Sequence, residues 1–410
     1  MINLETPKRM RAFVNQAHQV AAEFVRPLSR KYDLAEHAYP KELDILASMI
    51  DGLGESGQGQ GAGATGVRRG DDGDGGDGAD GDDGVRNGSN LASVLSIMEM
   101  SWGDVGLLLS MPRQGLGNSA IASVADAEQL ERFDGRWAGM AITEPGCGSD
   151  SAAIRTTAEL DGDDYVINGE KIFVTAGERC DAVVVWASLD RSKGRAAIKS
   201  FVVERGTPGM RVERLDRKLG IRASDTATIM FEDCRVPKAN LLGSPEIEDE
   251  QGFAGVMQTF DNTRPLVAAM AVGCAHAALE VTRDLLDAAG VAADYDRPSH
   301  LQHAAAAAYL AMEAEWEAAY LLTLQAAWLA DNGRPNSLQA SMAKAKAART
   351  ANDITLRCVE LAGSVGYSEH ELLEKWARDS KILDIFEGTQ QIQQLIVARR
   401  LLDLTSTELR

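Results

Sequence analysis

Near the carboxyl end of the chain, one carboxylate lies between an apolar pair and a Gly-Thr step. This residue is Glu387, in the segment DIFEGTQQIQ at 384–393, and the residues after it are predicted to form a helix. A carboxylate in this position is often a charge that stabilises a helix N-terminus. In a pocket without water its pKa would instead be raised, and it could take a proton from a substrate near neutral pH. This segment alone leaves both interpretations open.

A second segment with candidate chemistry is AITEPGCGSD at 141–150, which follows a predicted strand. Gly146 and Gly148 allow backbone N–H groups to approach a ligand closely, and Thr143 and Ser149 present hydroxyl groups. Such a loop suits a phosphate group or the polar edge of a flat ring. An ordinary strand-ending turn has a similar composition, so glycine and proline content alone does not decide between the two.

The elements that must position these segments change character along the chain. Apolar residues follow helical spacing in 6–50 and 89–133, short β-like runs occupy 136–236, and Ala-rich helical patterns follow after about residue 250. This order excludes a Rossmann fold or a TIM barrel, in which strands and helices alternate throughout. The predicted fold is a multidomain α+β fold with an N-terminal all-α domain at 1–135, a middle β-barrel or β-sandwich domain at 136–245 and a C-terminal four-helix bundle at 246–410.

Composition and charge exclude several classes of partner. The chain has 410 residues and a net charge of −19, whereas nucleic acids and anionic membranes require basic patches. Its five cysteines lack metal-ligand or redox spacing, so we expect no metal site and a reducing compartment such as the cytoplasm. The apolar run at 265–279 contains His276 and falls short of a membrane span.

One acidic insert differs from the rest of the chain. Residues 70–84 consist of seven aspartates, seven glycines and one alanine, which cannot bury enough apolar surface to offset ordering, so we predict disorder across roughly 52–88. An EF-hand fails because Gly76 occupies a ligand position and no glutamate closes the loop. A calcium-binding β-roll repeat fails because Asp82 occupies its apolar position and only one copy is present.

Five segments in chain order resemble the acyl-CoA dehydrogenase family. ITEPGCGSD is similar to that family's Thr-Glu-Pro-x-x-Gly-Ser-Asp flavin loop, and VINGEKIFVTAGERCDAVVVWASLD is similar to its Asn-Gly-x-Lys-x-Trp-Ile-Thr segment. The other three are LGIRASDTATIMFEDCRVPKANLLG, FDNTRPLVAAMAVGCAHAALE and RDSKILDIFEGTQQIQQLIVARR. Each match alone would be weak, whereas five in order are specific to the family.

The resemblance implies FAD-dependent α,β-dehydrogenation of an acyl-CoA thioester to a trans-2-enoyl-CoA, as in fatty-acid β-oxidation. Glu387 would be the catalytic base that takes the α-proton, while the β-hydride passes to flavin N5. A flavin ribityl hydroxyl and the backbone N–H of Glu387 would hold the thioester oxygen. The implied substrate-binding residues are Ser149, Asp261, Arg264 and Gly388. Arg264 would orient Glu387, and its alternative role is a structural ion pair at a helix start.

The resemblance also assigns the contacts of the flavin. Phe173 stands where the family has a tryptophan, so an aromatic face is kept and an indole donor is lost. The implied cofactor-binding positions are Met140, Ile142, Thr143, Gly148, Ser149, Phe173, Val174, Thr175, Thr389, Gln390 and Gln391.

Two segments depart from the family. In its homotetramers the ADP end of FAD is held by a neighbouring subunit, through an Arg-x-x-Phe-Gly and a Gln-x-x-Gly-Gly segment. Here the first reads DLLDAAGVAADYDRPSHLQ at 284–302, and the second reads ELAGSVGY at 360–367 with Glu360 for glutamine and Ser364 for glycine. A carboxylate beside a pyrophosphate is repulsive. The chain therefore lacks the half-site that it would lend to a copy of itself.

Three explanations of this departure remain open. The favoured one is an α2β2 hetero-oligomer, in which a paralogous acyl-CoA dehydrogenase subunit supplies the missing groups. The second is a homo-oligomer, such as a homotetramer, that binds FAD through other groups. The third is a non-catalytic partner or scaffold subunit, against which the intact Glu387-Gly388-Thr389 argues. An acyl-CoA oxidase-like flavoenzyme is a rival activity, and electron-transfer flavoprotein is the electron acceptor that the resemblance implies.

Overall fold

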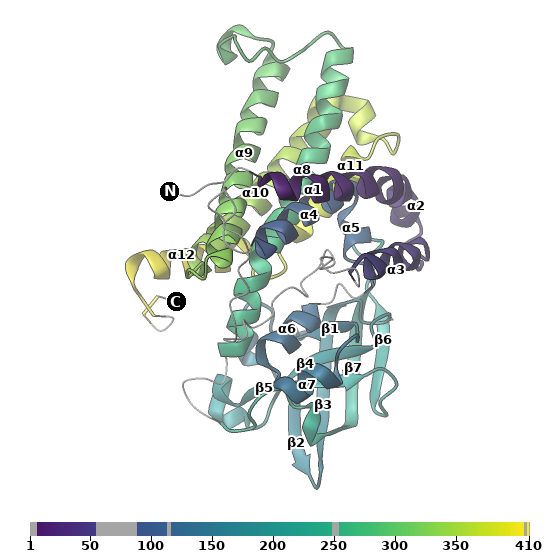
Figure 1. Ribbon diagram of the computed structural model, residues 1–410, viewed down its shortest axis with the longest axis vertical. Coiled ribbons are helices and arrows are strands. Elements are labelled where there is room, and N and C mark those ends of the chain that lie inside the picture. The colour runs from purple at the N-terminus through teal and green to yellow at the C-terminus, as the bar shows by residue number, and fades with distance from the viewer. Residues whose placement is uncertain (1–5, 55–87, 113–115, 248–253, 406–407, 410) are drawn as a thin grey trace.

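The computed structural model describes residues 6–54, 88–112, 116–247, 254–405 and 408–409. Long helices from the second half of the chain stand above a β-sheet, and helices α1 and α4 cross between them (Figure 1). The helices before the sheet are α1 (Lys8–Val20), the π-helical turn η1 (Ala21–Val25), α2 (Arg26–Leu34), α3 (Glu42–Gly54), α4 (Ser89–Gly103), α5 (Val105–Leu108), α6 (Leu116–Val124) and α7 (Ala127–Arg132).

The middle of the described chain forms a mixed sheet of seven strands in the order β1-β4-β2-β3-β7-β6, with β5 paired to β4. Strand β4 reads AVVVWAS and is buried along its whole length, because neighbouring strands flank it and other elements cover it. The strands are β1 (Ala138–Ala141), β2 (Thr157–Asp161), β3 (Asp164–Thr175), β4 (Ala182–Ser188), β5 (Ile198–Glu204), β6 (Met210–Leu215) and β7 (Thr226–Pro237). Short 3₁₀ turns are η3 (Ser151–Ala153), η4 (Arg191–Ala197) and η5 (Lys238–Asn240).

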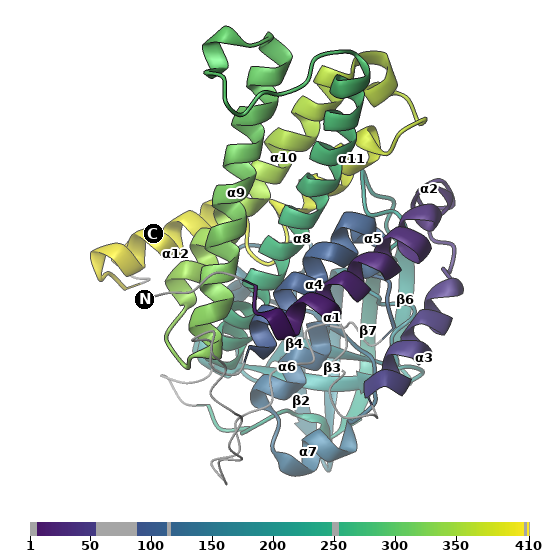
Figure 2. The ribbon, with the colours of Figure 1, turned by 45° about the horizontal axis from the view of Figure 1, so that its top comes forward.

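The helices after the sheet form a bundle. Helices α8 to α11 pack side by side, and α12 projects from the bundle on the side opposite α2 and α3 (Figures 1 and 2). Their bounds are α8 (Ala254–Ala288), the 3₁₀ turn η6 (Ser299–Leu301), α9 (Ala304–Asp331), α10 (Ser337–Tyr367), α11 (Leu373–Leu383) and α12 (Gln390–Leu402). The arrangement of helices, curled sheet and helices confirms the predicted α+β fold class.

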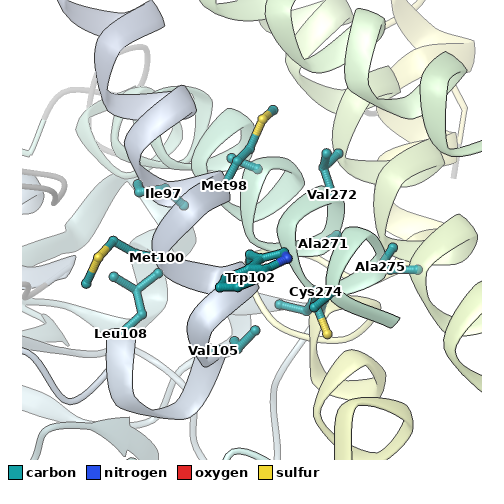
Figure 3. Packing of buried hydrophobic residues seen from close by; sticks show 14 of the residues in the cluster. Ile97, Met98, Met100, Trp102, Val105, Leu108, Ala271, Val272, Cys274 and Ala275 are labelled. Atoms are coloured by element: carbon teal, nitrogen blue, oxygen red, sulfur yellow. The ribbon is translucent and has the colours of Figure 1, made fainter. Parts of the chain in front are cut away.

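The N-terminal and C-terminal helices share one apolar core. Trp102 of α4 and Val105 of α5 pack against Cys274 of α8, as Figure 3 shows. The backbones of α4 and α8 approach closely at Gly273, where a Cβ atom would lie 2.0 Å from the Met98 carbonyl oxygen. Only glycine permits this approach, which brings α8 and its site residues against the N-terminal helices.

The apolar run at 265–279 was expected to fall short of a membrane span, and helix α8, which contains it, differs from that expectation. The segment Thr263–Ala288 is long and apolar enough to cross a membrane by length and composition, so the run does not fall short of a span. However, 72% of its most apolar window is buried inside the protein, as in a core helix of a globular fold.

Part of the predicted acidic insert also differs from expectation. Residues 55–87 lie outside the described residues, whereas residues 52–54, which were predicted to be disordered, form the last turn of α3. Strands β2 and β6 lie within the β-like region predicted at 136–236, although no run was singled out for either strand. The sequence of β6, MRVERL, carries three charged residues on an exposed edge strand, so its alternation of apolar and polar residues is weak.

Candidate active site

The first part of the site lies where β1 and β3 end. Met140 is in β1, and Ile142 and Thr143 follow it. The backbone N–H of Ile172 donates to the Thr143 carbonyl oxygen at 2.9 Å. This hydrogen bond places the start of the 141–150 loop beside the end of β3, where Phe173 lies.

Phe173 is turned outward by a β-bulge. The pairing of β3 with β7 shifts register between Lys171 and Val174, and Phe173 within that shift has a φ of +58°. Its side chain is 62% exposed, whereas Val174 is fully buried. Bulges re-aim side chains in this way beside functional sites. The result is an aromatic face directed away from the core, next to Thr143.

The loop is held from inside by a buried ion pair. Glu144 Oε1 accepts hydrogen bonds from Lys171 Nζ at 2.8 Å and from Thr156 Oγ1 at 2.6 Å, and Oε2 accepts from the Arg155 N–H at 2.6 Å. The Lys171 side chain is 0% and the Glu144 side chain 6% exposed. Burial opposes ionisation of Glu144, but Lys171 and Thr156 outweigh it and hold the pKa of this carboxyl below its ordinary value.

The outer part of the loop is open. Gly146, Gly148 and Ser149 are exposed. In the described part of the chain, a Cβ atom added to Gly146 or Gly148 would meet nothing within 4 Å. Packing within the chain therefore does not require glycine here, whereas close approach of a ligand to the backbone would.

The second part of the site is the turn between α11 and α12 that carries Glu387. Glu387 has a φ of +55° and Gly388 a φ of +88°, so two consecutive residues are left-handed. Gln393 Nε2 donates to the carbonyl oxygen of Glu387 at 3.0 Å and to that of Gly388 at 3.3 Å. Lys344 Nζ donates to the Gly388 carbonyl oxygen at 2.6 Å. These donors fix a backbone conformation that is unfavourable for glutamate.

The carboxylate of Glu387 is buried and hydrogen-bonded. The residue is 9% exposed, and its Oε2 accepts a hydrogen bond from Thr263 Oγ1 at 2.7 Å. Burial raises the pKa of Glu387, although the Thr263 hydrogen bond and the charges of Arg264 and Lys344 act in the opposite direction. A desolvated carboxylate with a raised pKa and a fixed oxygen can act as a general base.

The structure contradicts the alternative roles considered for Glu387 at a helix N-terminus and for Arg264 at a helix start. Helix α12 begins at Gln390, and its N-cap is Thr389, whose Oγ1 accepts from the Ile392 N–H at 3.4 Å. Glu387 therefore does not cap this helix. Arg264 lies inside α8, which begins at Ala254, and is 3% exposed. An ion pair at a helix start does not describe it.

The other candidate residues lie around these two groups. Thr175 is half-buried at the end of β3, Gln390 is buried in the first turn of α12, and Gln391 is exposed beside it. Asp261 lies in α8, and its side chain falls outside the part that the structure describes.

The sheet is connected to the helix that leads into the Glu387 turn. The Ile221 N–H, between β6 and β7, donates to Asp379 Oδ1 of α11 at 2.5 Å. Lys375 Nζ binds Asp379 Oδ2 at 2.5 Å and also forms a buried ion pair with Asp104. Gly220 lies so close to α11 that a Cβ atom would be 2.4 Å from the Arg378 carbonyl oxygen. One buried cluster therefore joins the N-terminal helices, the sheet and α11.

Sequence reasoning missed several residues of the site. Glu144 and Lys171 were inside the segments that resembled the family, but no role was predicted for either. No role was predicted for Thr263 either, although it is adjacent to the candidate residue Arg264. Lys344 lies in the Ala-rich segment SMAKAKAARTAND, where nothing distinguishes it from the surface lysine Lys346. Among the described residues, no group of three or more His, Cys, Asp or Glu side chains forms a metal site.

Comparison with known proteins agrees with this geometry. The family model for the acyl-CoA dehydrogenase middle domain matches residues 139–234, and the model for the C-terminal domain matches 250–402. A short-chain specific acyl-CoA dehydrogenase of Clostridium acetobutylicum is 35% identical over 322 residues, covering 77% of this chain and 83% of that protein. The mitochondrial short-chain specific acyl-CoA dehydrogenase of Rattus norvegicus is 40% identical over 263 residues, covering 64% of this chain and 62% of the rat enzyme.

The structural comparison gives the same result. The butyryl-CoA dehydrogenase of Megasphaera elsdenii has a TM-score of 0.79 and 29% identity, over 98% of this chain and 100% of that chain. The chain therefore belongs to the acyl-CoA dehydrogenase family. The aligned region spans less than two thirds of the rat relative, at 62% of its length.

Members of this family bind FAD, and residues of this chain fit that group. The exposed face of Phe173 suits a flat ring, and the Thr143 carbonyl oxygen accepts a hydrogen bond from the N–H of Ile172, the residue before it. The open backbone at Gly148 and Ser149 suits a polar edge or a phosphate group.

Proposed function

We propose that this chain catalyses the α,β-dehydrogenation of an acyl-CoA thioester to a trans-2-enoyl thioester, with Glu387 as the base. The observation that supports this proposal is the buried Glu387 carboxylate, whose Oε2 is held by Thr263 at 2.7 Å. The α-proton of a thioester is a very weak acid, so its removal needs a base with a fixed position and a raised pKa. The Glu387 turn meets both requirements.

The residues would divide the reaction as follows. Glu387 takes the α-proton from the substrate, and the α,β bond becomes double as the β-carbon loses a hydride. Gly388 gives the turn after the base its left-handed backbone, and Arg264 orients the carboxylate. Phe173, Thr143 and the 146–149 backbone would hold FAD. The chemistry that bound FAD supplies is acceptance of the hydride and its electron pair.

The substrate class, electron acceptor and compartment are further parts of the proposal. Both curated relatives compared above are short-chain specific enzymes and the solved structure is a butyryl-CoA dehydrogenase, which supports a short acyl chain. Electron-transfer flavoprotein is the acceptor that fits the family. The five cysteines are free and buried, which supports a reducing compartment such as the cytoplasm.

Replacing the base tests this activity. In the flavin-loaded enzyme, with its partner subunit where one is required, we expect Glu387→Gln to abolish turnover of butyryl-CoA and to leave the visible spectrum of the bound flavin unchanged. The control is Glu369→Gln, which changes an exposed carboxylate outside the site and should retain full activity. Normal turnover by Glu387→Gln would refute the assignment of the base. Hydrogen peroxide formed in place of reduced electron-transfer flavoprotein would instead favour the oxidase-like alternative.

We also propose that this chain works in an α2β2 assembly with a paralogous subunit. Glu360 lies on the surface of α10 and forms an ion pair with Arg357. Leu356, one helical turn before Glu360, is 60% exposed, so apolar surface lies beside this carboxylate. If the neighbouring subunit were a copy of this chain, the pyrophosphate of the FAD bound to it would meet the negative charge of Glu360 and be repelled. This repulsion supports a partner of different sequence.

The flavin-to-protein ratio tests the assembly. We expect the chain purified alone to be colourless, and co-expression with a paralogous acyl-CoA dehydrogenase subunit to give about one FAD per pair of chains. One FAD per chain in the protein purified alone would refute the hetero-oligomer and favour the homo-oligomer.

A further inference from the structure

A buried lysine contacts the turn that carries Glu387. Lys344 of α10 is 0% exposed, and its Nζ donates to the Gly388 carbonyl oxygen at 2.6 Å. Burying an ammonium group is costly unless the charge is compensated and hydrogen-bonded. The geometry of the turn explains why this ammonium group is buried beside the candidate base despite the free-energy cost.

The turn needs donors directed at its carbonyl groups. Glu387 and Gly388 are both left-handed, with φ values of +55° and +88°. The Gly388 carbonyl oxygen accepts from Lys344 and also from Gln393, at 2.6 and 3.3 Å. A charge-assisted hydrogen bond is about twice as strong as a neutral one. Lys344 therefore makes the stronger of the two contacts that hold the Gly388 peptide.

The charges around Lys344 come from two parts of the chain. Glu387 and Asp384 face it from the segment after α11, and Arg264 faces it from α8. Asp384 has two further cations, because Arg349 lies 3.4 Å and Lys381 3.2 Å from its Oδ2. Both of these side chains are about half exposed, at 49% and 46%. Since Asp384 is compensated from the solvent side, the charge of Lys344 is available to stabilise the Glu387 carboxylate.

We propose that Lys344 is a positioning residue for the catalytic base: its ammonium group holds the Gly388 carbonyl, and thereby the Glu387 turn, while its charge keeps the Glu387 carboxylate ionised. This inference rests on the proposed role of Glu387 as the base. Lys344 contacts neither the substrate nor the flavin in this account. It acts through the backbone and the charge of its neighbours.

The protonation of Lys344 gives the proposal a pH signature. Burial lowers the pKa of Lys344 to about 8, although Asp384 and Glu387 favour the charged form and Arg264 opposes it. The support for Glu387 is therefore complete below this pKa and is lost as the pH rises through it. Activity should decline on the alkaline side near pH 8 as the ammonium group loses its proton.

Substitutions of Lys344 in the flavin-loaded enzyme, with its partner subunit where one is required, test the proposal. We expect Lys344→Met to lower kcat/KM for butyryl-CoA by roughly ten- to hundredfold, as for a lost charged hydrogen bond. Its acid limb should move to higher pH, because the carboxylate loses a stabilising charge. The α-deuterium isotope effect on kcat should increase as proton removal becomes slower. Flavin content and KM should change little.

The conservative variant separates this role from mere packing. Arginine stays charged at all accessible pH values, so Lys344→Arg should recover most activity and should lack the decline near pH 8. The matched control is Lys346→Met, which removes a lysine of the same helix that pairs with Glu315 away from the Glu387 turn, and it should leave the pH profile unchanged. If Lys344→Met does not fold, the arginine variant still decides, because persistence of the wild-type alkaline decline in it would overturn the proposal.

The outcomes for the base and for the lysine are distinguishable. Normal turnover by Glu387→Gln would remove the base assignment, and Lys344 would then have nothing to position. An inactive Glu387→Gln together with a wild-type pH profile and isotope effect in Lys344→Met would overturn the Lys344 proposal alone.

Discussion

Replacement of Gly388 by alanine tests how the Glu387 turn is held. Gly388 has a φ of +88°, and a Cβ atom there would lie 2.5 Å from Gln393 Nε2. Gln393 is 0% exposed and donates to the carbonyl oxygens of both Glu387 and Gly388. Because its amide cannot keep both bonds and avoid the new methyl group, we expect the variant to lose the two hydrogen bonds as well as the backbone freedom of glycine.

The size of the expected decrease in stability follows from the loss of glycine's backbone freedom and the loss of the two Gln393 hydrogen bonds. A left-handed conformation costs a residue with a Cβ atom about 1–2 kcal/mol. Two buried neutral hydrogen bonds contribute about 1 kcal/mol each. We therefore expect Gly388→Ala to reduce the free energy of unfolding by roughly 3–4 kcal/mol, of which about half belongs to the displaced Gln393 amide.

A second glycine isolates the contribution of Gln393. Gly206, between β5 and β6, has a φ of +84°, and a Cβ atom there would meet nothing within 4 Å. Gly206→Ala carries the same backbone cost and the same change in the unfolded chain, without the contact. The difference between the two variants, measured by denaturant unfolding followed by circular dichroism, should be about 2 kcal/mol. Equal losses of stability in both variants would refute the role of Gln393 as a clamp on the turn.

Three further predictions concern the charged groups of the site. Lys171→Met leaves Glu144 buried without its cation, and should reduce the free energy of unfolding by about 3–5 kcal/mol in denaturant titrations and release flavin. Thr263→Val removes a hydrogen bond that favours the ionised Glu387, so the acid limb of kcat/KM should move to higher pH. Because burial raises the pKa of Glu387, the folded protein binds its proton more tightly than the unfolded chain. Wild type should therefore lose stability relative to Glu387→Gln as the pH rises above roughly 4.5, which melting temperatures across a pH series would show.

The sequence allowed the class of fold to be predicted because its strongest patterns are local. The apolar run of β4 and the long helices α9 and α10 follow directly from hydrophobic periodicity. The edge strand β6 lies within the region predicted to be β-like, but its exposed charged residues make its own pattern weaker than that of β4. Resemblance to a family identified Glu387 as the candidate base, whereas the segment alone did not decide its role.

The polar groups that support the site could not be predicted in the same way. Lys344 and Lys346 are two residues apart in one helix, yet only Lys344 is fully buried, because that depends on which face of α10 meets the turn after α11. Glu144 and Lys171 likewise meet only when β1 and β3 pair with the rest of the sheet. Burial of charge is decided by tertiary contacts, and single-residue patterns do not carry that information.

The shared core of the first and last helices has a consequence for the order in which the chain folds during synthesis. Helix α4 packs against α8, and Asp104 pairs with Lys375, which is 271 residues further along. The sheet, in contrast, has apolar clusters built largely from its own strands. On the ribosome, we therefore expect the sheet to fold before the helices that precede it. The first hundred or so residues leave the exit tunnel without their packing partners, and chaperones should bind this nascent segment until α8 and α11 have been made.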